Sequence, residues 1–192
     1  MSKLKIVLLL FVILFAVSGC KSITETVLPP PDTSGAQPFT VMTYNVHVGT
    51  GAEALLSVQN LSQVPQIAAA MYENIIASDF PERAAAIAKS IKTYQPHLVG
   101  LQEIALIRYQ NPGDFIPDNP TLAEIVVLDF LQILMDALQA EGVHYQVAAK
   151  VENLDIETPM LTDTGIDDVR LTDHDIILSR SDVDISNPMQ AT

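Results

Sequence analysis

Two polar residues, Asn45 and Glu103, stand at the ends of apolar segments in a way that suits metal or phosphate chemistry. Thr43-Tyr44-Asn45 and Leu101-Gln102-Glu103 each close a short apolar run. If both runs are buried strands of an open α/β sheet, their polar ends gather at the carboxyl edge, where ligands bind. Carboxylate and amide oxygens are the ligands that a hard cation such as Mg2+ prefers. The sequence therefore predicts one site that contains both Asn45 and Glu103.

The segments around these residues alternate between strand-like and helix-like patterns. Short apolar runs predict strands, and apolar residues at every third or fourth position predict helices. Because helices that alternate with strands pack on sheet faces, the expected fold class is α/β or α+β. The expected strands are 39–47, 97–102, 143–150 and a last strand within 169–180, and the expected helices are 62–77, 79–94 and 122–141. The acidic stretch 152–168 is expected to be irregular.

The helix before the second strand carries clear boundary signals. Asp79 can cap its first turn, with Glu82 three residues later as in a capping box. Gln95-Pro96 ends it, because a residue before proline disfavours helical geometry. The apolar residues between these limits recur at helical spacing and predict one face packed on a core. They are Ala84, Ile87, Ala88, Ile91 and Tyr94.

The first twenty residues have the pattern of an export signal. Two lysines precede an apolar run at 6–17, which is too short to span a bilayer comfortably. Small residues then precede Cys20, the only cysteine of the chain. This pattern is typical of bacterial lipoproteins, and a general secretory signal or an anchoring helix is the alternative. We expect removal of residues 1–19, a lipid on Cys20 that anchors the protein to the cell envelope outside the cytoplasm, and a proline-rich tether over 20–38.

The charge of the protein limits its partners. Ten basic residues stand against 23 acidic ones, for a net charge of −13, and loss of two lysines with the signal would make it −15. Such a chain repels polyanions and has no basic stripe, so nucleic acid is disfavoured as a partner. A small or lipidic phosphate ester remains compatible, because a bound divalent cation reverses the local field.

Three segments match a family pattern in the same order along the chain. Residues 39–46 read FTVMTYNV, residues 83–103 read RAAAIAKSIKTYQPHLVGLQE, and residues 175–180 read DIILSR. They resemble the opening strand, the helix-to-glutamate block and a later strand of the endonuclease/exonuclease/phosphatase superfamily of Mg2+-dependent phosphoesterases. The second segment is the most specific, because it matches through a helix, a proline and a terminal carboxylate.

The resemblance implies a fold and roles for two residues. The fold would be a four-layered α/β sandwich with two packed sheets, of which residues 39–192 form the amino-terminal part. Glu103 matches the family's ligand for Mg2+, which Mn2+ can replace, and Asn45 matches the catalytic asparagine beside the metal and the phosphate. The implied function is hydrolysis of a phosphodiester or phosphomonoester.

The chain also departs from the family pattern. His97 stands where the family usually has aspartate, and no Asp-x-Asn motif occurs in the sequence. Asp173-His174 lies just before the last strand, which is the wrong place for the family's terminal Asp-His pair, and a polar strand position is expected instead. We therefore expect this chain to be the amino-terminal part of a longer protein. We expect it to be inactive by itself, because no residue of the sequence is identified as the water-activating base or as the phosphate-contacting histidine.

Two other functions stay open. One is a non-catalytic surface lipoprotein that uses a degenerate half of the fold as a binding module, and the other is a secreted nuclease. In the first case Asn45 would only end a strand by bonding nearby backbone, and Glu103 would be a solvated carboxylate. A downstream Asp-x-Asn and Asp-His would exclude the binding module, and a basic downstream half would favour the nuclease.

The remaining polar groups are expected to be structural. Residues 48–51 contain two glycines, which predict a plain loop more strongly than a phosphate cradle. The acidic cluster of Asp163, Asp167 and Asp168 lacks the spacing of an EF-hand, so a solvated loop is expected. Arg83 is expected to contact the strands or an acid, and the two histidines His47 and His144 are expected to be structural or solvated.

Overall fold

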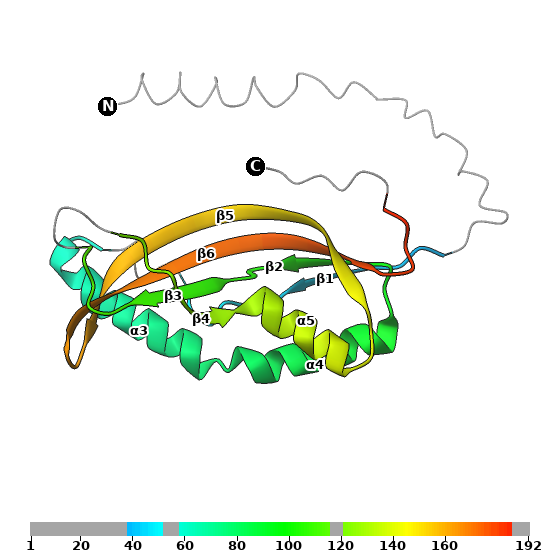
Figure 1. Cartoon of the computed structure of the whole chain (residues 1–192), viewed down its shortest axis with the longest axis horizontal. Coiled ribbons are helices and arrows are strands. Elements are labelled where there is room, and N and C mark those ends of the chain that lie inside the picture. The colour runs from blue at the N-terminus through cyan, green and yellow to red at the C-terminus, as the bar shows by residue number, and fades with distance from the viewer. Residues whose placement is uncertain (1–37, 52–57, 116–120, 186–192) are drawn as a thin grey trace, which may run out of the picture. The chain divides into compact units, whose positions relative to one another are not determined.

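A six-stranded mixed sheet with helices along one side forms the described part of the protein (Figure 1). The computed structural model describes residues 38–51, 58–115 and 121–185. The strands are β1 (Val41–Asn45), β2 (Leu98–Gln102), β3 (Leu106–Gln110), β4 (Ile125–Asp129), β5 (Tyr145–Thr162) and β6 (Gly165–Arg180). The helices are the short η1 (Leu61–Gln63), α3 (Val64–Ala77), α4 (Phe80–Tyr94) and α5 (Phe130–Ala140). The expected mixed α and β class is confirmed.

The expected export signal and tether lie outside the described residues, apart from Pro38 at the boundary. In the part of the chain that the structure describes, no helix is long and apolar enough to cross a membrane.

The long strand β6 organises the sheet. β5 pairs with it antiparallel along its whole length, from Tyr145 opposite Arg180 to Thr162 opposite Gly165. β2 and β3 pair antiparallel with successive stretches of β6, at 176–179 and 168–172. Because β5 occupies one edge of β6, β2 and β3 lie end to end along the other. β1 then pairs parallel with β2, and β4 pairs antiparallel with β3.

The boundaries expected for the helix before β2 are confirmed. Asp79 is the N-cap of α4, and its Oδ1 accepts a hydrogen bond from the Glu82 N–H at 3.3 Å. Such a bond satisfies one of the donors left free in the first turn. At the other end, Gln95 takes a left-handed conformation with φ 44°, and its N–H donates to the Ile91 carbonyl at 2.7 Å. Local side-chain chemistry thus sets where the chain turns into β2.

Helices α4 and α5 build the core against the sheet. The rings of Phe80 on α4 and Phe130 on α5 stack with centroids 3.7 Å apart, and both are fully buried. Val99 and Leu101 of β2 are also fully buried and belong to the same cluster. Burial of such side chains contributes about 1.5–3 kcal/mol each relative to exposure. The core therefore fixes β2, whose end carries Glu103.

The expected long helix over 122–141 is wrong in its first part. Ile125–Asp129 is the strand β4, and α5 begins only at Phe130. Ile125, Val126 and Val127 are β-branched and fit a pleated surface, where β4 pairs with β3. The Asp129 side chain then accepts from the Gln132 N–H at 3.0 Å and starts the helix. Tertiary pairing overrides the helical spacing here.

The expectation of an irregular 152–168 is also wrong. These residues lie in β5 and β6, which form a hairpin closed by the two residues between Thr162 and Gly165. β3 was not predicted at all. The acidic side chains on these strands are compatible with a sheet because arginines and main-chain N–H groups neutralise or bond several of them.

Candidate functional site

Asn45 and Glu103 meet at the carboxyl ends of neighbouring strands. β1 and β2 run parallel with Asn45 opposite Gln102, so Glu103 is the first residue beyond the paired segment. The Asn45 Nδ2 group donates to Glu103 Oε1 at 2.8 Å. The two residues are 58 positions apart in the chain, and the sheet alone brings them together.

Glu103 occupies a break between two collinear strands. Leu101 pairs with Ile176 of β6, and the next exchange of main-chain hydrogen bonds joins Ile104 to His174, at 2.9 and 3.2 Å. Two residues, Gln102 and Glu103, therefore oppose the single residue Asp175, which is the pattern of a β-bulge. Bulges re-aim side chains and occur next to functional sites.

The backbone at this bulge is strained. Glu103 has φ 60°, and His47, in the loop after β1, has φ 59°. Left-handed conformations are uncommon for residues other than glycine, asparagine and aspartate and cost about 1–2 kcal/mol. Two such residues lie side by side at one end of the β1–β2 pair. Strain of this kind clusters at functional sites, so it points to a role for this corner.

The loop after β1 folds over the carboxylate. The Val48 N–H donates to Glu103 Oε2 at 2.7 Å, and the His47 N–H donates to Asn45 Oδ1 at 2.8 Å. The His47 ring reaches to 3.8 Å from Oε2 through Nδ1. Each carboxylate oxygen of Glu103 thus has one donor and keeps further acceptor capacity. Sequence patterns could not point to Val48, because a main-chain donor carries no side-chain signal.

Arg83 holds this loop against the start of α4. Its Nε donates to the Ser78 carbonyl at 2.9 Å, its Nη2 donates to Ser78 Oγ at 3.0 Å, and its Nη1 donates to the Val46 carbonyl. Arg83 therefore contacts the residue that directly follows β1, in line with the expectation that it contacts the strands. It positions the loop and lends positive potential to the Glu103 carboxylate.

The Glu103 carboxylate is kept ionised. Burial raises the pKa of Glu103, but the hydrogen bonds from Asn45 and Val48, with the charges of His47 and Arg83, lower that pKa below its ordinary 4.5. The Glu103 side chain is 35% exposed, so solvent and solutes reach it. The site is an accessible anion at neutral pH.

These groups fit a hard cation that keeps most of its water. Mg2+ is commonly bound by one or two carboxylates, with waters and substrate phosphate oxygens completing its shell. Glu103 supplies one accessible carboxylate with acceptor capacity to spare, held in place by Asn45. Within the described ranges, no three side chains of His, Cys, Asp or Glu converge as a metal-binding group. Glu103 is the residue that would hold such an ion, and Asn45 the residue that would orient it.

A cavity of about 500 Å3 adjoins the carboxylate. Its walls come from α3, β3, β5, β6 and the loop after β1, and Glu103 lines it together with Thr50 and Gly51. The loop at 48–51, expected to be plain, therefore contributes one donor to Glu103 and part of a cavity wall. Most of the remaining lining residues are apolar.

Asp173 and His174 have different surroundings. Asp173 lines the same cavity as Glu103, and its Oδ2 accepts from Asn153 Nδ2 at 3.1 Å. His174 is buried, and its Nδ1 donates to the Ile104 carbonyl at 3.1 Å. Neighbouring residues of a strand point to opposite faces, so the two cannot act as a hydrogen-bonded pair. Asp173 is the second acidic group of the cavity, and no sequence motif identified it as such.

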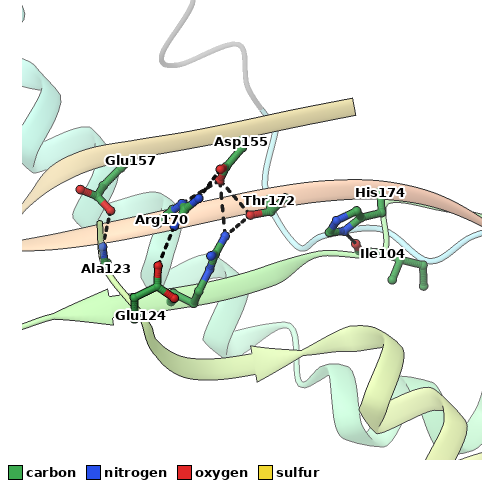
Figure 2. A network of polar contacts seen from close by, with 9 residues as sticks. Ile104, Ala123, Glu124, Asp155, Glu157, Arg170, Thr172 and His174 are labelled. Atoms are coloured by element: carbon green, nitrogen blue, oxygen red, sulfur yellow. Dashed lines mark hydrogen bonds and ion pairs between the residues drawn. The ribbon is translucent and has the colours of Figure 1, made fainter. Parts of the chain in front are cut away.

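A second polar cluster joins β3, β5 and β6 (Figure 2). Arg108 and Arg170 are directly opposite each other in the sheet, and Asp155 of β5 bridges them. Asp155 also accepts from Thr172 Oγ1 at 2.8 Å, and Glu124 pairs with Arg170 at 3.1 Å. The arginine side chains are only about a tenth exposed, so this cluster replaces lost hydration and holds the strands in register.

The expectation that Asp167 and Asp168 belong to a solvated loop is wrong. Both are buried in β6, at 2% and 0% exposure. Asp167 accepts from the Tyr109 hydroxyl and from Asn111 Nδ2, and Asp168 Oδ2 accepts from the N–H groups of Asp114 and Phe115 at 2.6 and 2.9 Å. These carboxylates bind the end of β3 and the loop that leaves it, because their donors lie there.

The resemblance to the phosphoesterase superfamily rests on three short segments. The structure places them on β1, on α4 with β2, and on β6, and β2 pairs with both β1 and β6. Comparison with known proteins returned no match: no protein-family model fits the chain, and no curated protein or solved structure is significantly similar to it.

Proposed function

We propose that this protein is a metal-dependent phosphoesterase, anchored by lipid to the cell envelope, in which the residues described here form the amino-terminal part of a four-layered α/β sandwich. The reaction class is hydrolysis of a phosphodiester or phosphomonoester. Glu103 would hold Mg2+, or Mn2+ in its place, and Asn45 would face the phosphate.

One observation carries the proposal. Asn45 Nδ2 donates to Glu103 Oε1 at 2.8 Å at the carboxyl ends of two parallel strands, and Glu103 and the neighbouring His47 both have left-handed backbone conformations. A residue that only ended a strand would need neither the partner nor the strain. The arrangement supports a pre-positioned anion with a polar amide beside it.

Glu103 and Asn45 would have different roles in the reaction. Glu103 binds the ion, whose chemistry when bound is to neutralise charge that develops on the phosphoryl oxygens and on the leaving group. Asn45 uses one N–H to orient Glu103 and has a second N–H for a phosphate oxygen. A general base and a further transition-state donor are also needed. Neither role is assigned among the described residues.

The proposal is tested by binding and turnover with simple esters. The full chain carrying Cys20→Ser, in buffer free of phospholipid, would be titrated with p-nitrophenyl phosphate and its bis-ester, with and without Mg2+, followed by 31P NMR and by release of p-nitrophenol. We expect Mg2+-dependent binding with turnover near the uncatalysed rate. Absence of Mg2+-dependent binding would contradict the proposed function. Robust turnover that Glu103→Ala abolishes would show that the base is present in this chain, against our expectation.

The lipid anchor is tested separately. We propose that Cys20 carries the lipid, because small residues and a short apolar run precede it. The native protein is expected to enter the detergent phase in phase partition, and Cys20→Ser is expected to move it to the aqueous phase. Equal partition of both proteins would refute a lipid on Cys20.

A further inference from the structure

The cavity beside Glu103 combines two carboxylates with a mostly apolar lining. Glu103 and Asp173 are the two charged residues of its lining, whereas α3 contributes the apolar Ala68, Met71 and Ile75 and the strands contribute mostly apolar side chains. Pockets of about 300–1,000 Å3 with apolar walls and a few placed polar groups are typical of ligand sites. The volume of about 500 Å3 falls within that range.

The apolar wall is also exposed to solvent where it opens. Leu154 and Ile156 of β5 line the cavity, yet they are 48% and 40% exposed. Ile156 lies opposite Leu171 of β6, so the two side chains share one face of the sheet and continue the wall inward. An open apolar cavity gains free energy when a hydrocarbon group fills it, by about 25 cal/mol per Å2 of surface removed from water.

The carboxylate and the apolar wall fit two different parts of one ligand, a charged part and a hydrocarbon part. Glu103 lies at the cavity with its charge retained, and an apolar chain alone would leave that charge beside it without a counter-ion. A phosphate without a chain would leave the apolar wall in contact with water. A ligand with a hydrocarbon chain and a phosphate head, joined through a divalent cation, satisfies both.

We propose that this cavity binds the hydrocarbon chain of an amphiphilic phosphate ester whose phosphate lies at Glu103. The position of the phosphate rests on the proposed function, whereas the chain-binding role of the cavity rests on its apolar lining. The substrate class is therefore a phosphate ester of an alkyl or acyl chain, in preference to a nucleotide or a sugar phosphate.

The test uses a series of alkyl phosphates that differ only in chain length. Methyl, butyl, hexyl and octyl phosphate would be titrated with Mg2+ into the full chain carrying Cys20→Ser, in buffer free of phospholipid and detergent, with 13C-methyl labels on methionine. Met71 lines the cavity, and Met135 on α5 does not, so the second methyl is an internal control. Each methylene that enters the cavity is expected to tighten binding about fourfold until the cavity is filled. The Met71 signal is expected to shift with octyl phosphate and not with methyl phosphate.

Two matched substitutions on α3 locate the chain. Ala68 is buried and lines the cavity, whereas Ala70 is exposed on the same helix. Ala68→Leu puts a larger side chain into the space and is expected to reduce the advantage of octyl over methyl phosphate by about tenfold or more. Ala70→Leu makes the same change outside the cavity and is expected to keep that advantage.

The outcomes separate the cavity from the proposed function. Octyl and methyl phosphate binding with equal affinity, or an unmoved Met71 signal in the unaltered protein, would overturn chain binding whether or not Ala68→Leu folds. Octanol binding as tightly as octyl phosphate, with no effect of Glu103→Gln on methyl phosphate, would instead overturn the phosphate site and leave the chain pocket standing. Failure of every ligand to bind would overturn both.

Discussion

Glu103→Gln is expected to weaken Mg2+ binding by about 100-fold or more. Substitution of groups that merely orient metal ligands commonly costs 10–100-fold in affinity, and Glu103 is the proposed ligand itself. Glutamine keeps the size of the side chain but removes its charge, so the loss reports the carboxylate. Isothermal titration of the full chain with Mg2+ measures it. The matched control is Glu73→Gln, at an exposed position on α3, which should bind Mg2+ as the unaltered protein does.

Asn45→Ala tests the same site through the pKa of Glu103. Loss of the Nδ2 donor should raise that pKa toward its ordinary 4.5, because this hydrogen bond is the first of the contacts that lower it. In the metal-free protein, the lowered pKa of Glu103 stabilises the folded state at pH values above the pKa of this group in the unfolded chain. This stabilisation disappears as the pH falls through the pKa of the group in the folded state. A 13C titration of the Glu103 carboxyl measures the shift. An unchanged pKa in Asn45→Ala would separate Asn45 from Glu103 and contradict the supporting role given to it.

Asp155→Ala is expected to destabilise the fold by about 3 kcal/mol, because removal of one partner from a largely buried ion pair leaves an uncompensated charge. Asp155 is the bridge between Arg108 and Arg170, which lie directly opposite each other, and like charges in such positions repel. Pulse proteolysis in urea measures the free energy of unfolding of the full chain.

The control for this change is another aspartate that pairs with an arginine. Asp182 bonds Arg180 at 2.6 Å, but both side chains are solvent-accessible, so Asp182→Ala should leave the urea midpoint nearly unchanged. Equal effects of the two substitutions would show that the Asp155 cluster acts as an ordinary surface pair. Asp155→Asn should fall between them, since it keeps a hydrogen-bond acceptor without the charge.

The parts of the fold that the sequence predicted are those with local signals. α4 was predicted at both ends because Asp79 and Gln95 mark its boundaries within one turn. β1 and β2 were predicted because each is a compact apolar run with a polar end. The meeting of Asn45 and Glu103 followed from the geometry of parallel strands, which places carboxyl ends together.

The parts that were not predicted depend on distant partners. β4 has helical spacing but pairs with β3, and β3 in turn exists through its pairing with β6. The acidic hairpin was obscured by its charge, although the turn at Asp163-Thr164-Gly165 was a usable signal. The bulge at Glu103 could not be foreseen, because no glycine marks its left-handed residue. The cavity arises from the position of α3 over the strands, which no sequence pattern specifies.

The pairing of the strands also implies an order of assembly. β5 and β6 are joined by two residues, so their pairing closes a very short loop, whereas Asn45 and Glu103 must close one of 58 positions. Closure entropy grows with loop length, and contacts between distant residues slow folding. β2 needs the edge of β6, and β1 needs the edge of β2. The hairpin is therefore expected to form early, and the Asn45–Glu103 contact is expected to form after it.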